Sequence, residues 1–358
     1  MASGVPSERR RSTLADVAAG AGVSLMTASY AYSRPGRVSE RARGRVLAAA
    51  AELGYPGPDP RARSLRRGTT LTLGVVLGEY LTYAFDDPGA VAFMAGIAEV
   101  CADRGYGMTI LPLTGAAEDA RRITDAAVDG FVVWTTSEDD PALAAIRATR
   151  RPAVVHGGPA GAGATVVTID DRAAARAVGA LAFAGARRPA VVSQPLDRDR
   201  RSHVGRGIDV DSVAFPVTRA RLAGYREAAE ESGVDWNDVL VAVCSRNDAT
   251  EAEQITRGLL GSARPPDAIA AMSDQMAAGV VRAARAAGRA VPDDLAVTGW
   301  DDLPVAAELG LTTVAQSLRD QGAACARVAL GQEPPATVPW SVVPRATTTK
   351  RVASRPPA

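Results

Sequence analysis

From residue 71 onward, short apolar runs alternate with longer amphipathic stretches. The apolar runs lie at residues 71–77, 107–113, 130–134, 153–155, 190–193, 239–244, 268–272 and 295–299. The stretches between them have the length and the 3.6-residue period of helices. Apolar strands joined by helices are typical of parallel sheets covered on both faces. The alternation therefore predicts two doubly wound α/β lobes, each of ordinary domain size.

The segment before this alternation predicts a different, all-helical structure. Residues 13–34 are expected to form two short helices around a tight turn, because Thr13 with Asp16 makes a capping box and Ser24 can cap the second helix. A third helix is expected at residues 39–53. This order is that of a helix-turn-helix, whose second helix enters the DNA major groove. A three-helix protein-interaction module would have the same elements.

Helical spacing divides these helices into buried and outward faces. The apolar positions expected to be buried are Leu14, Val17, Ala18, Ala21, Ala28, Ala31, Val46, Leu47, Ala50 and Leu53. The candidates for DNA contact are Thr13, Ser24, Leu25, Met26, Thr27, Ser29, Tyr30, Arg34, Arg63 and Leu65.

Charge separates the two parts of the chain. Residues 1–70 contain 12 arginines and five acidic residues, a net charge of +7, whereas the whole chain carries only +1. The remainder is therefore acidic, with a net charge of −6. A basic head on an acidic body is expected when one end of a protein meets a polyanion. Phosphate contacts explain this excess better than a solvated helix face does.

Three ordered pieces of the head resemble one known family. T-L-x-D-V-A-x-x-A-G-V-S-x-x-T-x-S begins at Thr13, R-V-S-E-x-x-R-x-R-V-L-x-A-A-x-E-L-G-Y begins at Arg37, and A-R-S-L-R-R-G ends at Gly68. Together they resemble the DNA-binding segment of the lactose-repressor (LacI) family. The resemblance implies a homodimeric, cytoplasmic transcriptional regulator that binds a pseudo-palindromic operator in double-stranded DNA, with tetramers as a further assembly.

Residues 59–67 read as a short helix, because Asp59 can cap it and Pro60 fits its first position. At about two turns it is too short to be stable alone. The resemblance implies that this hinge helix pairs with its twin in the minor groove, and that Leu65 wedges between base pairs and bends the duplex. A flexible linker with one leucine is the alternative.

The resemblance also implies how the body is divided. The expected order is a flexible basic arm (1–12), a helix-turn-helix domain (13–58), a hinge (59–70), an effector-binding and dimerisation core (71–345) and a tail (346–358). The chain is expected to cross between lobes near residues 162–168, 301–304 and 316–320. The first lobe then comprises about 71–163 plus 303–332, and the second about 164–301 plus 333–345. Such a two-lobed core is similar to periplasmic binding proteins.

Doubly wound lobes bind ligands at the carboxyl ends of their strands, so two facing lobes predict a cleft. Tyr80, Tyr83 and Phe85 follow the first strand of the core, where a ligand could be stacked, although ordinary loop packing would also use them. Trp134 and His156 end later strands. His156 can face the cleft or serve a core or loop role.

The resemblance implies further effector contacts in the second half of the chain. Arg221, Asp301 and Gln316 match family positions that bind the effector, and an arginine with a carboxylate can hold vicinal hydroxyls. As salt-bridge partners alone they would be unremarkable. Two candidate positions depart from the family, because Ser273 stands where asparagine is common and Asn247 where a stacking aromatic is common. The polar stretch at residues 197–209 is expected to be a solvent loop.

Catalytic, metal and membrane functions find little support. The two histidines have no nucleophile or carboxylate at a diagnostic spacing, and the three cysteines are isolated, so we expect no catalytic residue, metal or cofactor. No run of about 18 apolar residues and no signal segment is evident, which favours the cytoplasm over export as a solute-binding protein.

These observations predict a sequence-specific repressor whose operator affinity is controlled by a small molecule, a sugar or related metabolite, bound between two lobes. A regulator with a protein co-effector and an activator are the alternatives, and a solute-binding protein is the remote one.

Overall fold

The structure is a computed structural model of the chain that describes residues 12–57, 68–78, 81–113, 118–160, 164–335 and 337–348. The chain divides into two compact units, residues 1–70 and residues 71–358. The predicted hinge helix, with Arg63 and Leu65, lies outside the described residues, as do the 1–11 arm and the end of the tail.

The first unit contains α1 (Leu14–Gly20), α2 (Leu25–Ser33), a 3-10 turn (Pro35–Arg37) and α3 (Glu40–Glu52). The predicted caps are confirmed. The Asp16 amide donates to the Thr13 hydroxyl and the Thr13 amide donates to the Asp16 carboxylate, while Ser24 and Ser39 cap α2 and α3. Most of the predicted core is also confirmed, with Val17, Ala28 and Val46 fully buried.

Leu47 and Leu53 were expected to be buried, and this was wrong. They remain 42% and 40% exposed, and Leu14 is only half-buried. Small side chains make the close contacts of α3 instead. A Cβ added to Gly20 of α1 would make ordinary contacts with the Ala49 Cβ at 3.5 Å and the Leu53 Cδ1 at 3.7 Å, so Leu53 meets α1 with only one edge.

The first lobe of the second unit is built on a parallel sheet in the order β2-β1-β3-β4-β5. Its strands are β1 (Thr72–Leu77), β2 (Gly107–Pro112), β3 (Gly130–Trp134), β4 (Ala153–His156) and β5 (Thr165–Val167). Side chains alternate between the two faces, as the pleat requires. Val75 packs in the core beneath α6, whereas Val76 packs in the core beneath α8.

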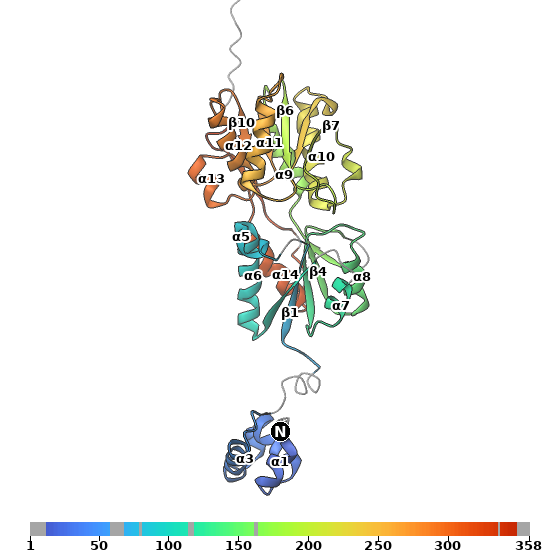
Figure 1. Cartoon of the computed structure of the whole chain (residues 1–358), viewed down its shortest axis with the longest axis vertical. Helices are drawn as coiled ribbons and strands as arrows, with labels where there is room; N and C mark the ends of the chain where they lie inside the picture. The colour runs from blue at the N-terminus through green and yellow to red at the C-terminus, as the bar shows by residue number, and fades with distance from the viewer. Residues whose placement is uncertain are drawn as a thin grey trace, which may run out of the picture. The chain divides into compact units, whose positions relative to one another are not determined.

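Helices cover both faces of this sheet (Figure 1). The helices α6 (Pro88–Arg104) and α14 (Leu318–Ala329) pack against each other on one side, with the short α5 (Tyr83–Asp86) beside them, and α7 (Glu118–Thr124) and α8 (Pro141–Ala148) lie on the other. The contact between α6 and α14 is unusually close. A Cβ on Gly96 would lie 1.9 Å from the Arg319 carbonyl oxygen, so only glycine fits there.

The second lobe repeats the plan, with the sheet order β10-β9-β6-β8-β7. Its strands are β6 (Pro189–Ser193), β7 (His203–Arg206), β8 (Leu240–Val243), β9 (Ala268–Ala271) and β10 (Ala296–Thr298). The pair α9 (Asp171–Phe183) and α10 (Pro216–Glu231) and the pair α11 (Ala249–Leu260) and α12 (Asp274–Ala286) cover it. Single 3-10 turns occur at Val210–Ser212 and Trp236–Asp238.

The polar insertion at residues 197–209 is not simply a solvent loop. Its second half forms β7, an antiparallel edge strand in which Val204 lies opposite Ala242 of β8. The sequence did not predict this strand because its residues are mostly polar or glycine. An edge strand that is exposed to solvent on one side needs few apolar side chains.

The expected assignment of residues 303–332 to the first lobe differs from the structure. The helix α13 (Pro304–Leu309) and the strands β11 (Thr313–Ala315) and β12 (Ser341–Val343) lie with the second lobe, where Ala306, Leu311 and Val314 join its core. Only α14 returns to the first lobe, where its Gly322 meets the α6 backbone. At the first crossing, β5 still belongs to the first lobe, and the chain changes lobe between residues 167 and 171.

Candidate functional site

A cavity lies between the two lobes, where the carboxyl ends of their strands face each other. Including the solvent-filled space at its open mouth, it has a volume of about 860 Å³. It is lined by Tyr83, Asp87, Trp134, Thr135, His156, Thr168, Asp171, Gln194, Pro195, Arg200, Phe215, Val217, Thr218, Arg221, Asn247, Asp301, Gln316, Leu318 and Gln321.

Aromatic rings form the wall contributed by the first lobe. Trp134, at the end of β3, stacks on the imidazole of His156 at the end of β4, with centroids 5.1 Å apart and planes at 30°. The rings of Phe93 and Tyr83 meet Trp134 edge-on, with centroids at 4.7 and 6.3 Å. Phe215 contributes a ring from the second lobe. The cavity therefore offers flat apolar surface on both sides.

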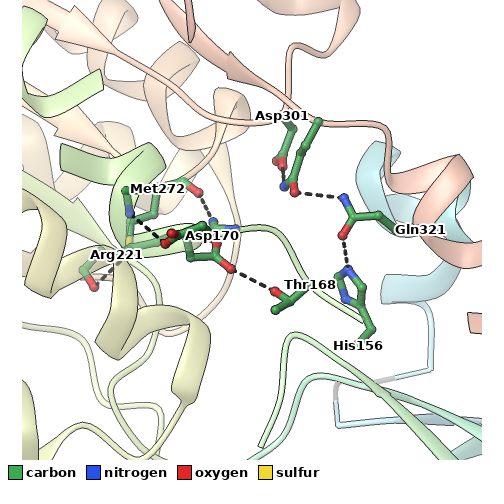
Figure 2. Close-up of polar contacts among 11 residues, drawn as sticks. His156, Thr168, Asp170, Arg221, Met272, Asp301 and Gln321 are labelled. Atoms are coloured by element: carbon green, nitrogen blue, oxygen red, sulfur yellow. Dashed lines mark hydrogen bonds and ion pairs between the residues drawn. The ribbon is translucent and has the colours of Figure 1, made fainter. Parts of the chain in front are cut away.

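A row of hydrogen bonds crosses from one lobe to the other (Figure 2). The Gln316 Nε2 donates to Asp301 Oδ1 at 2.7 Å, and the Gln321 Nε2 donates to Gln316 Oε1 at 3.0 Å. The remaining Gln321 oxygen lies 2.9 Å from His156 Nε2 and must accept, so His156 donates from Nε2 and its Nδ1 is an acceptor. That Nδ1 is buried and has no hydrogen-bond partner among the described residues.

Burial shifts the pKa of the groups at both ends of this row. It lowers the pKa of His156, so the ring is held neutral. Burial also raises the pKa of Asp301 well above its ordinary value, against the opposing effects of Arg221 and of the Gln316 hydrogen bond. Asp301 adopts a φ of 106°, a region that non-glycine residues rarely occupy. Strain of this kind is concentrated at functional sites.

Arg221 enters the cavity from α10 and is fixed on three sides. Its Nε donates to Asp171 Oδ1 at 2.8 Å, one terminal nitrogen donates to the Met272 carbonyl at 2.9 Å, and the guanidinium lies 4.0 Å from the ring centroid of Trp300. The Arg221 and Asp171 side chains are only 8% and 6% exposed. The second terminal nitrogen has no hydrogen-bond partner among the described residues, so it is available to a ligand.

Three further contacts join the lobes. Asn247 donates to Asp87 Oδ2 at 2.7 Å, Arg219 pairs with Glu138 at 2.9 Å, and Arg200 donates to the Gly78 carbonyl at 3.1 Å. Asp87 caps α6, and burial raises its pKa. Polar contacts therefore join the two lobes in this arrangement.

Seven of the residues predicted from the sequence line the cavity, namely Tyr83, Trp134, His156, Arg221, Asn247, Asp301 and Gln316. Phe85 does not, and it is 65% exposed. Residues two apart on a helix point to opposite sides, so once α5 turns Tyr83 inward, Phe85 points out. Ser273 also lies behind the wall, where its hydroxyl caps α12 and donates to Asn247. Tyr80 lies outside the described residues.

The sequence interpretation missed several lining residues. Asp87 reads as an ordinary helix cap, and Asp171 and Gln321 lie within helices. Phe215 precedes a proline at the start of α10, which was the only available signal.

Comparison with known proteins agrees with this architecture. Residues 13–57 match the family described as bacterial regulatory proteins, lacI family, and residues 178–348 match a periplasmic binding protein-like domain. The chain is 38% identical over 322 residues to the HTH-type transcriptional regulator Rv3575c of Mycobacterium tuberculosis, covering 88% of this chain and 90% of that protein. The chain belongs to the LacI family of bacterial transcriptional regulators.

Two solved structures are also similar to this LacI-family chain. A LacI-family regulator from Corynebacterium glutamicum is 30% identical with a TM-score of 0.72, covering 95% of this chain and all of that one. The complex of the regulator CelR with cellobiose is 27% identical with a TM-score of 0.66, covering 94% and 100%. Family membership makes the protein a DNA-binding transcriptional regulator, and the predicted fold class is confirmed.

The described residues contain no group of three or more His, Cys, Asp or Glu side chains placed to hold a metal ion. No helix in the described part of the chain is long and apolar enough to cross a bilayer.

The second helix of the helix-turn-helix in this LacI-family head is α2. Leu25 and Met26 near its start are 55% and 64% exposed. The side-chain hydroxyls of Ser24 and Thr27 form a hydrogen bond, with 2.9 Å between their oxygens. Tyr30 is half-buried, and the Arg34 guanidinium lies 6.0 Å from its ring centroid. The outward residues therefore present apolar and aromatic surface.

Tyr30→Arg is expected to change base preference. An arginine fork can bond both O6 and N7 of one guanine, a contact worth about 1–3 kcal/mol of discrimination, whereas the Tyr30 hydroxyl offers a single donor or acceptor. Selection of binding sites from randomised half-sites should show a new guanine preference at one symmetric pair of positions in the variant. An unchanged sequence logo would mean that Tyr30 packs on the backbone without reading bases.

Asp274 supports the Asp301 turn from beneath. Its carboxylate accepts from the Leu303 amide and the Thr313 hydroxyl, each at 2.7 Å. Burial raises its pKa from 3.8 to about 6. A carboxyl whose pKa is raised by folding binds its proton more tightly in the native state, so it stabilises the fold less as pH rises from about 4 to about 6.

We expect Asp274→Asn to change the pH dependence of stability. From about pH 4 to pH 6 the free energy of unfolding of the wild type should fall by about 3 kcal/mol relative to that of the variant, because asparagine does not titrate. Urea denaturation of both proteins at pH 4 and pH 7 measures the difference. Parallel pH profiles would show that Asp274 is not the titrating group.

Proposed function

We propose that this LacI-family regulator is a repressor that releases its operator when a neutral sugar or polyol binds between the lobes. The observation that carries the proposal is the composition of the cavity, which is lined by the side-chain amides of Gln194, Asn247, Gln316 and Gln321 together with aromatic rings. An amide both donates and accepts, as a hydroxyl does. Aromatic walls with amide and hydroxyl rims suit a ring that carries several hydroxyl groups.

Arg221 and Asp301 are proposed to orient this ligand. The free terminal nitrogen of Arg221 supplies a charge-assisted donor, and the carboxyl oxygen of Asp301 that Gln316 leaves unbonded supplies the complementary group. The cellobiose bound by CelR supports the same ligand class for this chain.

The ligand is proposed to act by changing the angle between the lobes. A bound ligand shifts the equilibrium only by the difference between its affinities for the two arrangements. Residues of both lobes line the cavity, such as His156 of the first and Arg221 of the second, so a ligand that contacts both lobes binds one lobe arrangement more tightly than another. We propose that the chain acts as a homodimer on a pseudo-palindromic operator, and that the lobe angle decides whether the two hinge segments can pair on DNA.

A thermal-shift screen of the full chain tests this function. Pentoses, hexoses, disaccharides, cyclitols, nucleosides and purines would each be added at millimolar concentration. A ligand at 100 times its Kd stabilises the native state by about 2.7 kcal/mol, a shift of about 5 °C for a unit of this size. We expect one hydroxyl-rich compound to raise the melting temperature and Asn247→Ala to reduce that rise. A hit limited to purines, or no hit at all, would contradict the proposed ligand class.

A further inference from the structure

A second concave surface lies on the outer side of the second lobe, between β7 and α11. We name it the β7–α11 groove. It is lined by Val204, Arg206, Leu240, Gln254, Ile255, Gly258, Leu259, Ser262, Ala263 and Arg264. None of these residues lines the cavity between the lobes. The effector proposal therefore makes no use of this surface.

The strand β7 gives the groove one wall and an open edge. In the described part of the chain, β7 pairs only with β8, so its outer backbone groups have no strand partner. Val204 and Arg206 are two residues apart and point to the same face. Val204 is 46% exposed, whereas the apolar side chains of Leu240, Ile255 and Leu259 that line the groove with it pack in or against the core of the lobe. An open edge beside an apolar groove is the geometry that an added strand uses.

Gly258 lines the groove without a side chain that would project into it. It lies inside α11, where glycine is less favourable than any other residue except proline. Its φ is not positive, and a Cβ added to it would meet no atom within 4 Å. Packing within the described structure therefore gives no reason for glycine here, whereas the corresponding Cβ on Gly279 of α12 would meet backbone at 2.2 Å. An occupant lying across α11 would supply the reason.

The groove is positively charged at one end. Arg206 and Arg264 also line an adjoining hollow that contains Arg187 and Arg188. None of the four arginines forms an ion pair with a carboxylate among the described residues, although Asp235 and Asp238 border the hollow. Arg206 donates to the Asp238 carbonyl and Arg188 to the Pro265 carbonyl. These acceptors carry no net charge, so the positive charges of the arginines remain available to a partner. Complementarity calls for an acidic group.

We propose that the β7–α11 groove binds an extended segment of a partner protein that carries apolar residues followed by carboxylates. The segment adds a strand to the open edge of β7, its apolar side chains lie against Val204, Ile255 and Leu259, and its carboxylates pair with Arg206 and Arg264. Backbone hydrogen bonds to an edge strand provide affinity, and the side-chain pockets provide specificity.

Peptide display on the full-length protein tests the proposal. A library of random 12-residue peptides would be selected against the wild type, and the enriched peptides would then be synthesised and titrated by fluorescence anisotropy. We expect enriched sequences with alternating apolar residues next to Asp or Glu. Gly258→Leu, which fills the groove, and Arg264→Glu, which reverses the charge, should each weaken binding at least about tenfold.

Matched variants separate occupancy of the groove from unfolding or general charge. Gly258→Leu should leave the melting temperature unchanged or raise it, because leucine is the better helix former and meets no clash. Arg285→Glu reverses an exposed arginine of α12 that does not line the groove, and it should leave peptide binding unchanged.

Four outcomes would overturn the proposal. The enriched peptides could lack acidic residues or bind Gly258→Leu as tightly as the wild type. Sedimentation could show that Gly258→Leu changes the oligomeric state, which would make the groove a contact between copies of this chain. Arg264→Glu could instead weaken binding to a duplex without an operator, which would make the arginines a DNA contact. None of these results bears on the sugar proposal, whose readout is the melting-temperature screen.

Discussion

Arg221→Ala is expected to lower the free energy of unfolding of the two-lobed unit by about 3–5 kcal/mol. The substitution leaves Asp171 buried at 6% exposure without its cationic partner, and an uncompensated buried charge is costly. It also removes the guanidinium that lies 4.0 Å from the centroid of Trp300. Urea denaturation of the full chain, followed by tryptophan fluorescence, measures the loss.

A double-mutant cycle separates this charge effect from simple loss of packing. Asp171→Asn combined with Arg221→Gln replaces the ion pair with two amides of similar size, so neither side chain keeps an unpaired charge. The double variant should be more stable than Arg221→Gln alone, with a coupling energy of about 1–3 kcal/mol. Additive single effects would show that the ion pair is not what holds Arg221 in the cavity wall.

Asp301→Asn is expected to weaken effector binding about 10- to 100-fold while operator affinity in the absence of effector stays near that of the wild type. Asparagine tolerates the positive φ at this position and can still accept from Gln316, but its amide nitrogen replaces the second carboxyl oxygen. A ligand hydroxyl that donates to that oxygen then loses its acceptor. Calorimetric titration with the compound found in the thermal-shift screen measures the change.

Asp302→Asn is the matched control. It stands next to Asp301, also has a positive φ, and pairs with Arg345 rather than lining the cavity. It should leave effector affinity unchanged. Equal losses in the two variants would mean that the whole turn, and not the Asp301 side chain, supports the ligand.

Local patterns predicted the local structure well. The capping box at Thr13 and Asp16 is satisfied by atoms three residues apart, so it can be recognised in the sequence. The buried strands behave in the same way, because a run such as residues 130–134 is apolar on both faces wherever a parallel sheet is covered on both sides. The site residues at strand ends, including Trp134 and His156, followed from this order.

Contacts between distant segments could not be predicted in this way. The return of α14 to the first lobe depends on two glycines, Gly96 and Gly322, that let two helix backbones touch although they are far apart in sequence. Asp87 looks like a helix cap in isolation, and its hydrogen bond to Asn247 depends on how the lobes meet. Phe85 was misplaced because a loop was assumed where one turn of helix forms.

The central claim is that a ligand between the lobes controls operator affinity. The direct measurement is fluorescence anisotropy of a labelled operator, obtained by site selection and titrated with the full chain, with and without the compound found in the thermal-shift screen. We predict that the compound weakens operator binding about 5- to 150-fold in the wild type, the usual range of allosteric coupling, and that Asp301→Asn needs about 10 to 100 times more compound for the same release. A compound that occupies the cavity and leaves operator affinity unchanged would contradict the account.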